Sequence, residues 1–66
     1  MKPLSGKELC SLLETNGWTI ARVHGSHYIF VKTGSVVRIS VPVHANRKLK
    51  TGLQRHLLRL AGLKTE

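Results

Sequence analysis

The chain has 66 residues, too few for two hydrophobic cores, so we expect one compact domain over residues 1–66. Eleven Lys and Arg against three Glu and no Asp give a formal net charge of +8, which favours a polyanionic partner, either nucleic acid or an acidic protein. The single cysteine excludes an internal disulfide, and no long apolar run opens the chain as a signal peptide or membrane span would, so we expect a cytoplasmic protein.

A first helix is predicted from Gly6 to Thr15. Ser5 and Glu8 have the spacing of a capping box, in which each residue satisfies the other's backbone amide. Gly17 can adopt the left-handed conformation that ends a helix. The apolar residues at helical spacing, which predict the buried side, are Leu9, Leu12 and Leu13.

The next segment is rich in β-branched and aromatic residues and contains two turn signals, Gly25-Ser26 and Thr33-Gly34-Ser35. Turns this short predict an antiparallel meander. The three predicted strands are Trp18–His24, His27–Lys32 and Val36–Val41. Pro42 is expected to end the last strand because it has no amide hydrogen to donate.

Alternation alone does not assign the two faces of this sheet consistently. Ile20 and His24 are an even number of residues apart, so alternation puts them on one face. Phe30 and His27 are an odd number apart, so they fall on opposite faces. We place Tyr28 and Phe30 towards the core and His27 outward.

A second helix follows the loop of residues 43–50. Thr51 and Gln54 have the spacing of another capping box, and Gly62 can end the helix with Leu63 folded back on its last turn. The predicted buried side consists of Leu53, Leu57, Leu60 and Ala61. The order is α-β-β-β-α, an α+β fold in which both helices can cover one face of the sheet.

The turn at Gly25-Ser26 brings two histidines together. With Gly25 at the first central position of a two-residue loop, His24 and His27 face each other, about 5 Å apart at Cβ. Two imidazoles can serve as general base and acid near neutral pH, or they can simply be a polar end to the hairpin. One cysteine and no Asp make a metal site a weak interpretation, and no Ser-His-Asp set supports acyl transfer. Phosphodiester cleavage is the remaining chemistry, with histidine moving protons and cations holding the phosphate.

Basic residues gather around the start of the second helix: Arg47, Lys48, Lys50, Arg55 and Arg59. Free amides and the dipole at a helix N-terminus add to such charges, so the pattern predicts binding of a nucleic-acid backbone, unless it is only a solvated face. The sequence has no Gly-rich nucleotide loop and no evident aromatic stacking platform. We expect no metal and no other cofactor.

Several stretches in these elements resemble the HicA-type toxins of bacterial toxin–antitoxin pairs: "NGW", "RVHGSHYIF", "VPVH" and "LKTGLQRHLLRLAGL". The resemblance runs from about Leu4 to Leu63. It implies a double-stranded-RNA-binding-like α-β-β-β-α fold, endoribonuclease activity on messenger RNA that arrests translation, and neutralisation by a HicB-type antitoxin covering the active surface. It also implies that the catalytic residue is the histidine of Gly-Ser-His, His27, supported by the turn residues Gly25 and Ser26. The resemblance gives no role to His24.

The sequence therefore predicts a metal-independent ribonuclease in which His27 acts as general base or acid while a 2′-hydroxyl attacks the adjacent phosphate. The predicted RNA-binding residues are Arg47, Lys48, Lys50 and Arg55. The second proton-transfer group stays open among His24, His44 and a lysine. The alternative is a non-catalytic RNA-binding module, since double-stranded-RNA-binding domains grip phosphates with a lysine cluster at the start of the second helix. A basic accessory protein of a larger assembly is a third interpretation.

Overall fold

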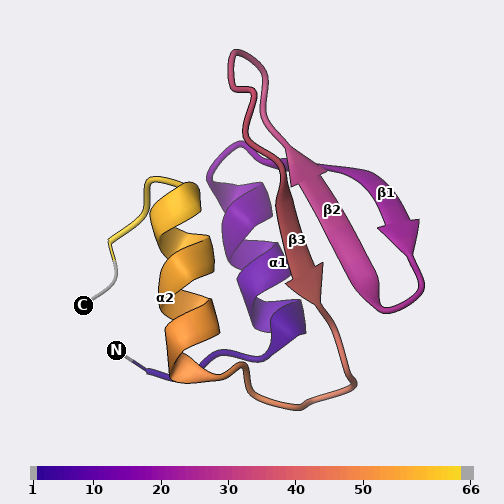
Figure 1. Cartoon of the computed structure of the whole chain (residues 1–66), viewed down its shortest axis with the longest axis vertical. Helices are drawn as coiled ribbons and strands as arrows, with labels where there is room; N and C mark the ends of the chain where they lie inside the picture. The colour runs from indigo at the N-terminus through magenta and orange to yellow at the C-terminus, as the bar shows by residue number, and fades with distance from the viewer. Residues whose placement is uncertain (1, 65–66) are drawn as a thin grey trace.

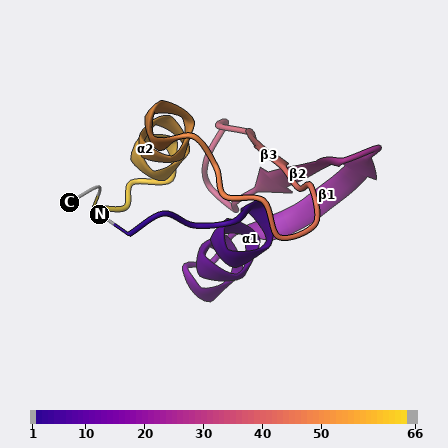
Figure 2. The same cartoon turned by 90° about the horizontal axis from the view of Figure 1, so that it is seen from below.

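The computed structural model describes residues 2–64 and confirms the predicted α+β order (Figure 1). Its elements are α1 (Gly6–Thr15), β1 (Thr19–His24), β2 (His27–Val31), β3 (Ile39–Pro42) and α2 (Thr51–Leu60). The strands form one antiparallel sheet in the order β1-β2-β3, and both helices lie on the same side of it (Figure 2). Within residues 2–64, no helix is long and apolar enough to cross a membrane.

The capping residues of α1 act as the sequence predicts. The amide of Glu8 donates to Ser5 Oγ at 3.1 Å, and the amide of Ser5 donates to Glu8 Oε1 at 2.8 Å. At the other end Gly17 has a φ of 91°, and the amide of Trp18 donates to the carbonyl of Leu13. Trp18 is buried and its amide is used in this cap, so β1 begins one residue later than predicted.

The buried side of α1 differs from the predicted stripe at one residue, because Leu12 is 36% exposed. The residues that face the core are Gly6, Leu9, Cys10 and Leu13. Their spacing of three, four and seven residues is that of one helix face. Burial also raises the pKa of the Cys10 thiol, with the charge of Glu14 adding to the effect.

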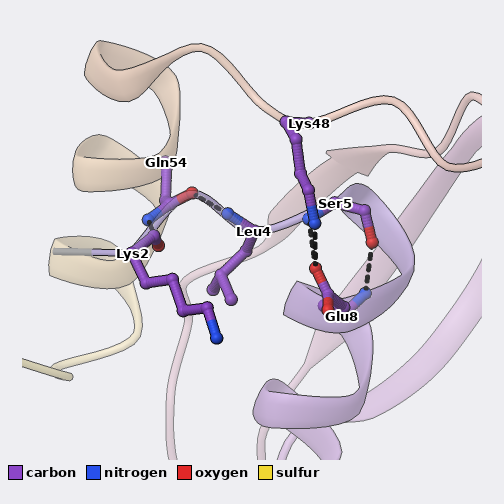
Figure 3. A network of polar contacts seen from close by, with 6 residues as sticks. All are labelled: Lys2, Leu4, Ser5, Glu8, Lys48 and Gln54. Carbon is purple, nitrogen blue, oxygen red and sulfur yellow. Dashed lines mark hydrogen bonds and ion pairs between the residues drawn. The ribbon is translucent and has the colours of Figure 1, made fainter.

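The capping box predicted for α2 is wrong. Lys50 is the N-cap residue and makes no side-chain capping bond, while Gln54 is turned inward and is 4% exposed. Gln54 Oε1 accepts from the amide of Leu4 at 2.7 Å, and its Nε2 donates to the carbonyl of Lys2 at 3.0 Å (Figure 3). The side-chain amide of Gln54 thus holds the N-terminal segment instead of capping its own helix.

Burying Gln54 also rotates α2 away from the predicted orientation. The buried residues are Gln54, Leu57 and Leu58, whereas Leu53 and Leu60 are more than a third exposed. The C-terminal prediction is confirmed, because Gly62 has a φ of 74° and the amide of the following Leu63 donates to the Leu58 carbonyl.

The third strand is shorter than predicted and shifted towards Pro42. Residues 36–38 have no strand partner because β2 ends at Val31 and Ser35 closes a turn onto Lys32. Pro42 lies inside β3, opposite His27. A proline is tolerated there because β3 is an edge strand, so its nitrogen can face outward.

A β-bulge in β1 explains why alternation gave two answers for the sheet. Ile20 pairs with Phe30 and Arg22 pairs with Ile29, so Ala21 is the extra residue between them. The bulge turns Ile20 to the helix side while Arg22 lies on the other side. The assignment of Phe30 to the core is confirmed, since it is fully buried while His27 is exposed.

The core lies between the helices and the inner side of β2 and β3. Its residues are Leu9, Cys10, Leu13, Trp18, Phe30, Ile39, Val41, Leu57 and Leu58. All six residues of β1 are exposed, including Ile20 and Val23 on the helix side. The helices therefore cover two of the three strands.

Close packing at Gly6 joins the start of α1 to the end of β3. A Cβ built on Gly6 would overlap the carbonyl oxygen of Pro42 and lie 3.0 Å from Val43 Cα. Only a residue without a side chain permits this approach. Gly6 consequently fixes the helix against the strand residue opposite His27.

We expect Gly6→Ala to destabilise the fold by about 1–3 kcal/mol, because backbone atoms must move to admit the methyl group. Gly52→Ala is the matched control, since no atom lies within 4 Å of a Cβ at this helical glycine, and it should stabilise by up to about 1 kcal/mol. Urea unfolding followed by the fluorescence of Trp18 measures both. Equal effects of the two substitutions would contradict the packing argument.

The folded protein is expected to lose stability in acid as the carboxylate of Glu8 becomes protonated. The Ser5 backbone amide, followed by Lys48, lowers the pKa of Glu8 below its ordinary value of 4.5. A lowered folded-state pKa means that the stabilisation is fully present above 4.5 and is lost as pH falls through the folded value. At pH 7 the free energy of unfolding of the wild type should therefore exceed that of Glu8→Gln. The difference between the two proteins should disappear in acid. A difference that stayed constant down to pH 2 would contradict this.

Candidate active site

The hairpin turn has the geometry predicted for it. Gly25 has a φ of 62°, and His24 and His27 are Cα partners at the ends of β1 and β2. Directly opposed residues of an antiparallel pair project to the same face. The two imidazoles therefore stand together on the face of the sheet turned away from the helices, which we call the outer face.

The outer face carries polar and cationic groups around His27. Arg22 pairs with Ile29 and lies diagonal to His27 on one side, while Ser40 also pairs with Ile29 and lies diagonal on the other. Pro42 is directly opposite His27 on β3. His27 thus has neighbours from both flanking strands.

One of these neighbours contacts the imidazole directly. Ser40 Oγ lies 3.4 Å from His27 Nδ1, a long hydrogen bond in which the proton can belong to either group. Because Nδ1 is engaged from the β3 side, Nε2 is the ring nitrogen left for another molecule. An imidazole held in this way can accept or donate a proton at Nε2.

The charge around the outer face is positive. Among residues 2–64 the glutamates are Glu8 and Glu14, and both belong to α1, on the other side of the sheet. Arg22 is exposed beside the histidines. The local field therefore favours an anion at this face.

The predicted RNA-binding residues are divided by the structure. Arg47 follows a turn in which its amide donates to the His44 carbonyl, and this loop leaves β3 beside the histidine turn, where the amide of Val43 donates to the Ser26 carbonyl. Arg47 and His44 are exposed. The loop that carries them leaves β3 at the end of the sheet where the histidine turn lies (Figure 1).

Lys48, Lys50 and Arg55 lie nearer the helices. Lys48 Nζ is 3.1 Å from Glu8 Oε1, so an ion pair offsets its charge (Figure 3). Lys50 is the N-cap residue of α2, and Arg55 is exposed on that helix, on the opposite side of the sheet from the outer face. Arg47 thus lies in the loop that starts beside the histidine turn, whereas Arg55 lies on a helix behind the sheet.

Neither Arg22 nor Ser40 was predicted from the sequence as a site residue. Regular pairing from the turn places Arg22 on the face of His24, and the shifted start of β3 decides the partner of Ser40. Alternation from His24 back to Arg22 was the available signal for the arginine, while nothing local marked Ser40.

The other groups with reactive side chains do not join this site. Cys10 is buried on the inner side of α1, and His56 is exposed on α2. Within residues 2–64, no three His, Cys, Asp or Glu side chains come together as a metal ion would require. The outer face is thus an arrangement of imidazoles, a hydroxyl and cations.

The sequence from residue 6 to residue 63 matches a protein family described as HicA toxin of bacterial toxin-antitoxin. No curated protein sequence matches the chain. The matched range contains both helices, all three strands and the histidine turn. The chain therefore belongs to the HicA toxin family and has a toxin role, which implies an antitoxin partner.

Proposed function

We propose that the protein is a toxin endoribonuclease that cleaves messenger RNA in the cytoplasm and so arrests translation. The observation that carries the proposal is the pair of opposed histidines on the cationic outer face, of which His27 is hydrogen-bonded through Nδ1. Membership of the HicA toxin family supports the same function.

Cleavage requires one base and one acid. His27 takes the proton of a ribose 2′-hydroxyl through Nε2 as the 2′-oxygen forms a bond to the adjacent phosphorus. The bond from phosphorus to the 5′-oxygen breaks, and that oxygen receives a proton from the second group. The products are a 2′,3′-cyclic phosphate and a 5′-hydroxyl. Both proton transfers use side chains alone, so the mechanism needs no metal.

His24 is the candidate best placed to be the second group. It stands directly across the strands from His27, at the roughly 5 Å Cβ separation of opposed residues. The phosphate bridged by the two imidazoles lies beside Arg22, whose guanidinium can stabilise the charge that develops on its oxygens. His44, the other histidine near this end of the sheet, lies outside the strands.

The RNA backbone continues from the histidine turn along the loop after β3. Arg47 and Lys50 bind successive phosphates there, with Lys48 and Arg55 adding charge nearer the helices. A HicB-type antitoxin with an acidic surface neutralises the toxin by covering the same cations and the histidine turn.

We expect His27→Ala to lower the cleavage rate of a long single-stranded RNA by at least about a hundredfold, because a positioned proton-transfer group is lost. His27 is exposed, so the variant should fold normally. His56→Ala is the matched control, since it removes an exposed histidine of α2. Gel analysis with purified proteins in EDTA measures cleavage, and a parallel binding assay shows whether each protein still holds the RNA.

Each outcome of that assay has a distinct meaning. Cleavage by the wild type and by His56→Ala, but not by His27→Ala, supports the proposal. Binding without cleavage by all three proteins contradicts it and favours a non-catalytic RNA-binding module. His24→Ala in the same series should also be slow, and full activity of that variant would leave His44 or a lysine as the second group.

The double variant Arg47→Ala, Lys50→Ala should weaken RNA binding and flatten its salt dependence. Each phosphate contact to a single strand contributes about 0.7 to the slope of log affinity against log salt, so the slope should fall by about 1.4. The control removes two other exposed lysines, Lys7 and Lys64. If the control lowered the slope equally, the binding would depend on net charge and not on the loop.

A further inference from the structure

The proposed function assigns Ser40 no role of its own, although its side chain contacts His27. It joins two strands, since His27 begins β2 and Ser40 is the second residue of β3. The distance from Ser40 Oγ to His27 Nδ1 is 3.4 Å, so the hydroxyl lies at Nδ1 and leaves Nε2 without this contact.

The backbone around this contact is well fixed. Ser40 lies between Ile39 and Val41, which are both fully buried, so its Cα cannot move without disturbing the core. Pairing of Ile29 with Ser40 and of Pro42 with His27 sets the position of β3 along β2. The hydroxyl is therefore carried by a rigid strand, although its side chain is exposed.

A hydroxyl suits the orientation of an imidazole that must change its charge. Its oxygen can accept the Nδ1 hydrogen of the neutral ring and also of the protonated ring, because Nδ1 keeps its hydrogen in both states. With Nδ1 donating, the lone pair of neutral His27 is at Nε2, where a base is needed. The reverse arrangement, with the hydroxyl donating, would leave Nε2 protonated and unable to act as a base.

We propose that Ser40 is a positioning residue for His27, accepting the Nδ1 hydrogen so that the Nε2 lone pair is directed at the RNA. This inference rests on the proposed function for its effect on cleavage, but its effect on the imidazole is independent of any substrate. Ser40 itself does not touch the reacting atoms.

The test compares Ser40→Val with Ser40→Thr. The two side chains have nearly the same shape and both suit a β-strand, but only threonine keeps a hydroxyl. ¹⁵N NMR of the free protein, at a pH where the imidazole is neutral, shows which ring nitrogen of His27 bears the hydrogen. The cleavage assay then gives kcat and KM for each protein.

In the wild type and in Ser40→Thr we expect the hydrogen on Nδ1. In Ser40→Val we expect a shift towards the Nε2-protonated form, with kcat about three- to tenfold lower, as one hydrogen bond would give, and with KM unchanged. Ser11→Ala, which removes an exposed hydroxyl from α1, should change none of these quantities.

Several results would overturn the inference: a hydrogen on Nε2 in the wild type, the same tautomer in Ser40→Val, or a Ser40→Val enzyme as fast as Ser40→Thr. If the wild type cleaves no RNA, the proposed function fails, and the NMR comparison alone then decides whether Ser40 positions His27. A change in KM without a change in tautomer would likewise reject positioning in favour of a binding role.

Discussion

The four residues of β3 connect the core of the protein to its outer face. Ile39 and Val41 point inward and are fully buried, while Ser40 and Pro42 point outward beside His27. Because strand side chains alternate, the position that buries the two apolar residues also places the two outward residues. A slip of one residue would expose the core and remove the hydroxyl from the histidine at the same time.

The helices hold this strand in place from the other side. α1 approaches the end of β3 through Gly6, whose lack of a side chain admits the carbonyl of Pro42. α2 is joined to the N-terminal segment by Gln54, which bonds the backbone of Lys2 and Leu4. The bonds of Gln54 satisfy its buried side-chain amide. Both helices thereby pack against one strand, which stabilises a chain with so small a core.

The edge strand β1, unlike β3, is not held against the helices. Its residues are all exposed, and its bulge at Ala21 changes which side chains share a face. The bulge costs one regular pairing, and it puts Ile20 on the helix side although Arg22 and His24 lie on the outer face. The strand that lies farthest from the core therefore contributes an apolar side chain to the helix side and a cation to the surroundings of His27.

Local sequence signals were sufficient for the ends of α1, the C-terminal cap of α2 and the histidine turn. Each depends on residues within about five positions of one another, such as Ser5 with Glu8, so no tertiary information was needed. The choice of His27 over His24 came instead from the resemblance of Gly-Ser-His to HicA-type toxins and stays a prediction. The errors arose where a distant segment competed for a side chain, as when Gln54 bound the N-terminal backbone instead of capping its own helix.

The sequence by itself determined the order of the elements, the opposition of His24 and His27, and the strong positive charge. Only the tertiary structure decided which side of α2 is buried, on which face Ile20 lies, and that Ser40 contacts His27. Helix and turn formation depends on neighbours along the chain, whereas a bulge, a helix rotation or a contact between strands is chosen by the packing of the whole molecule.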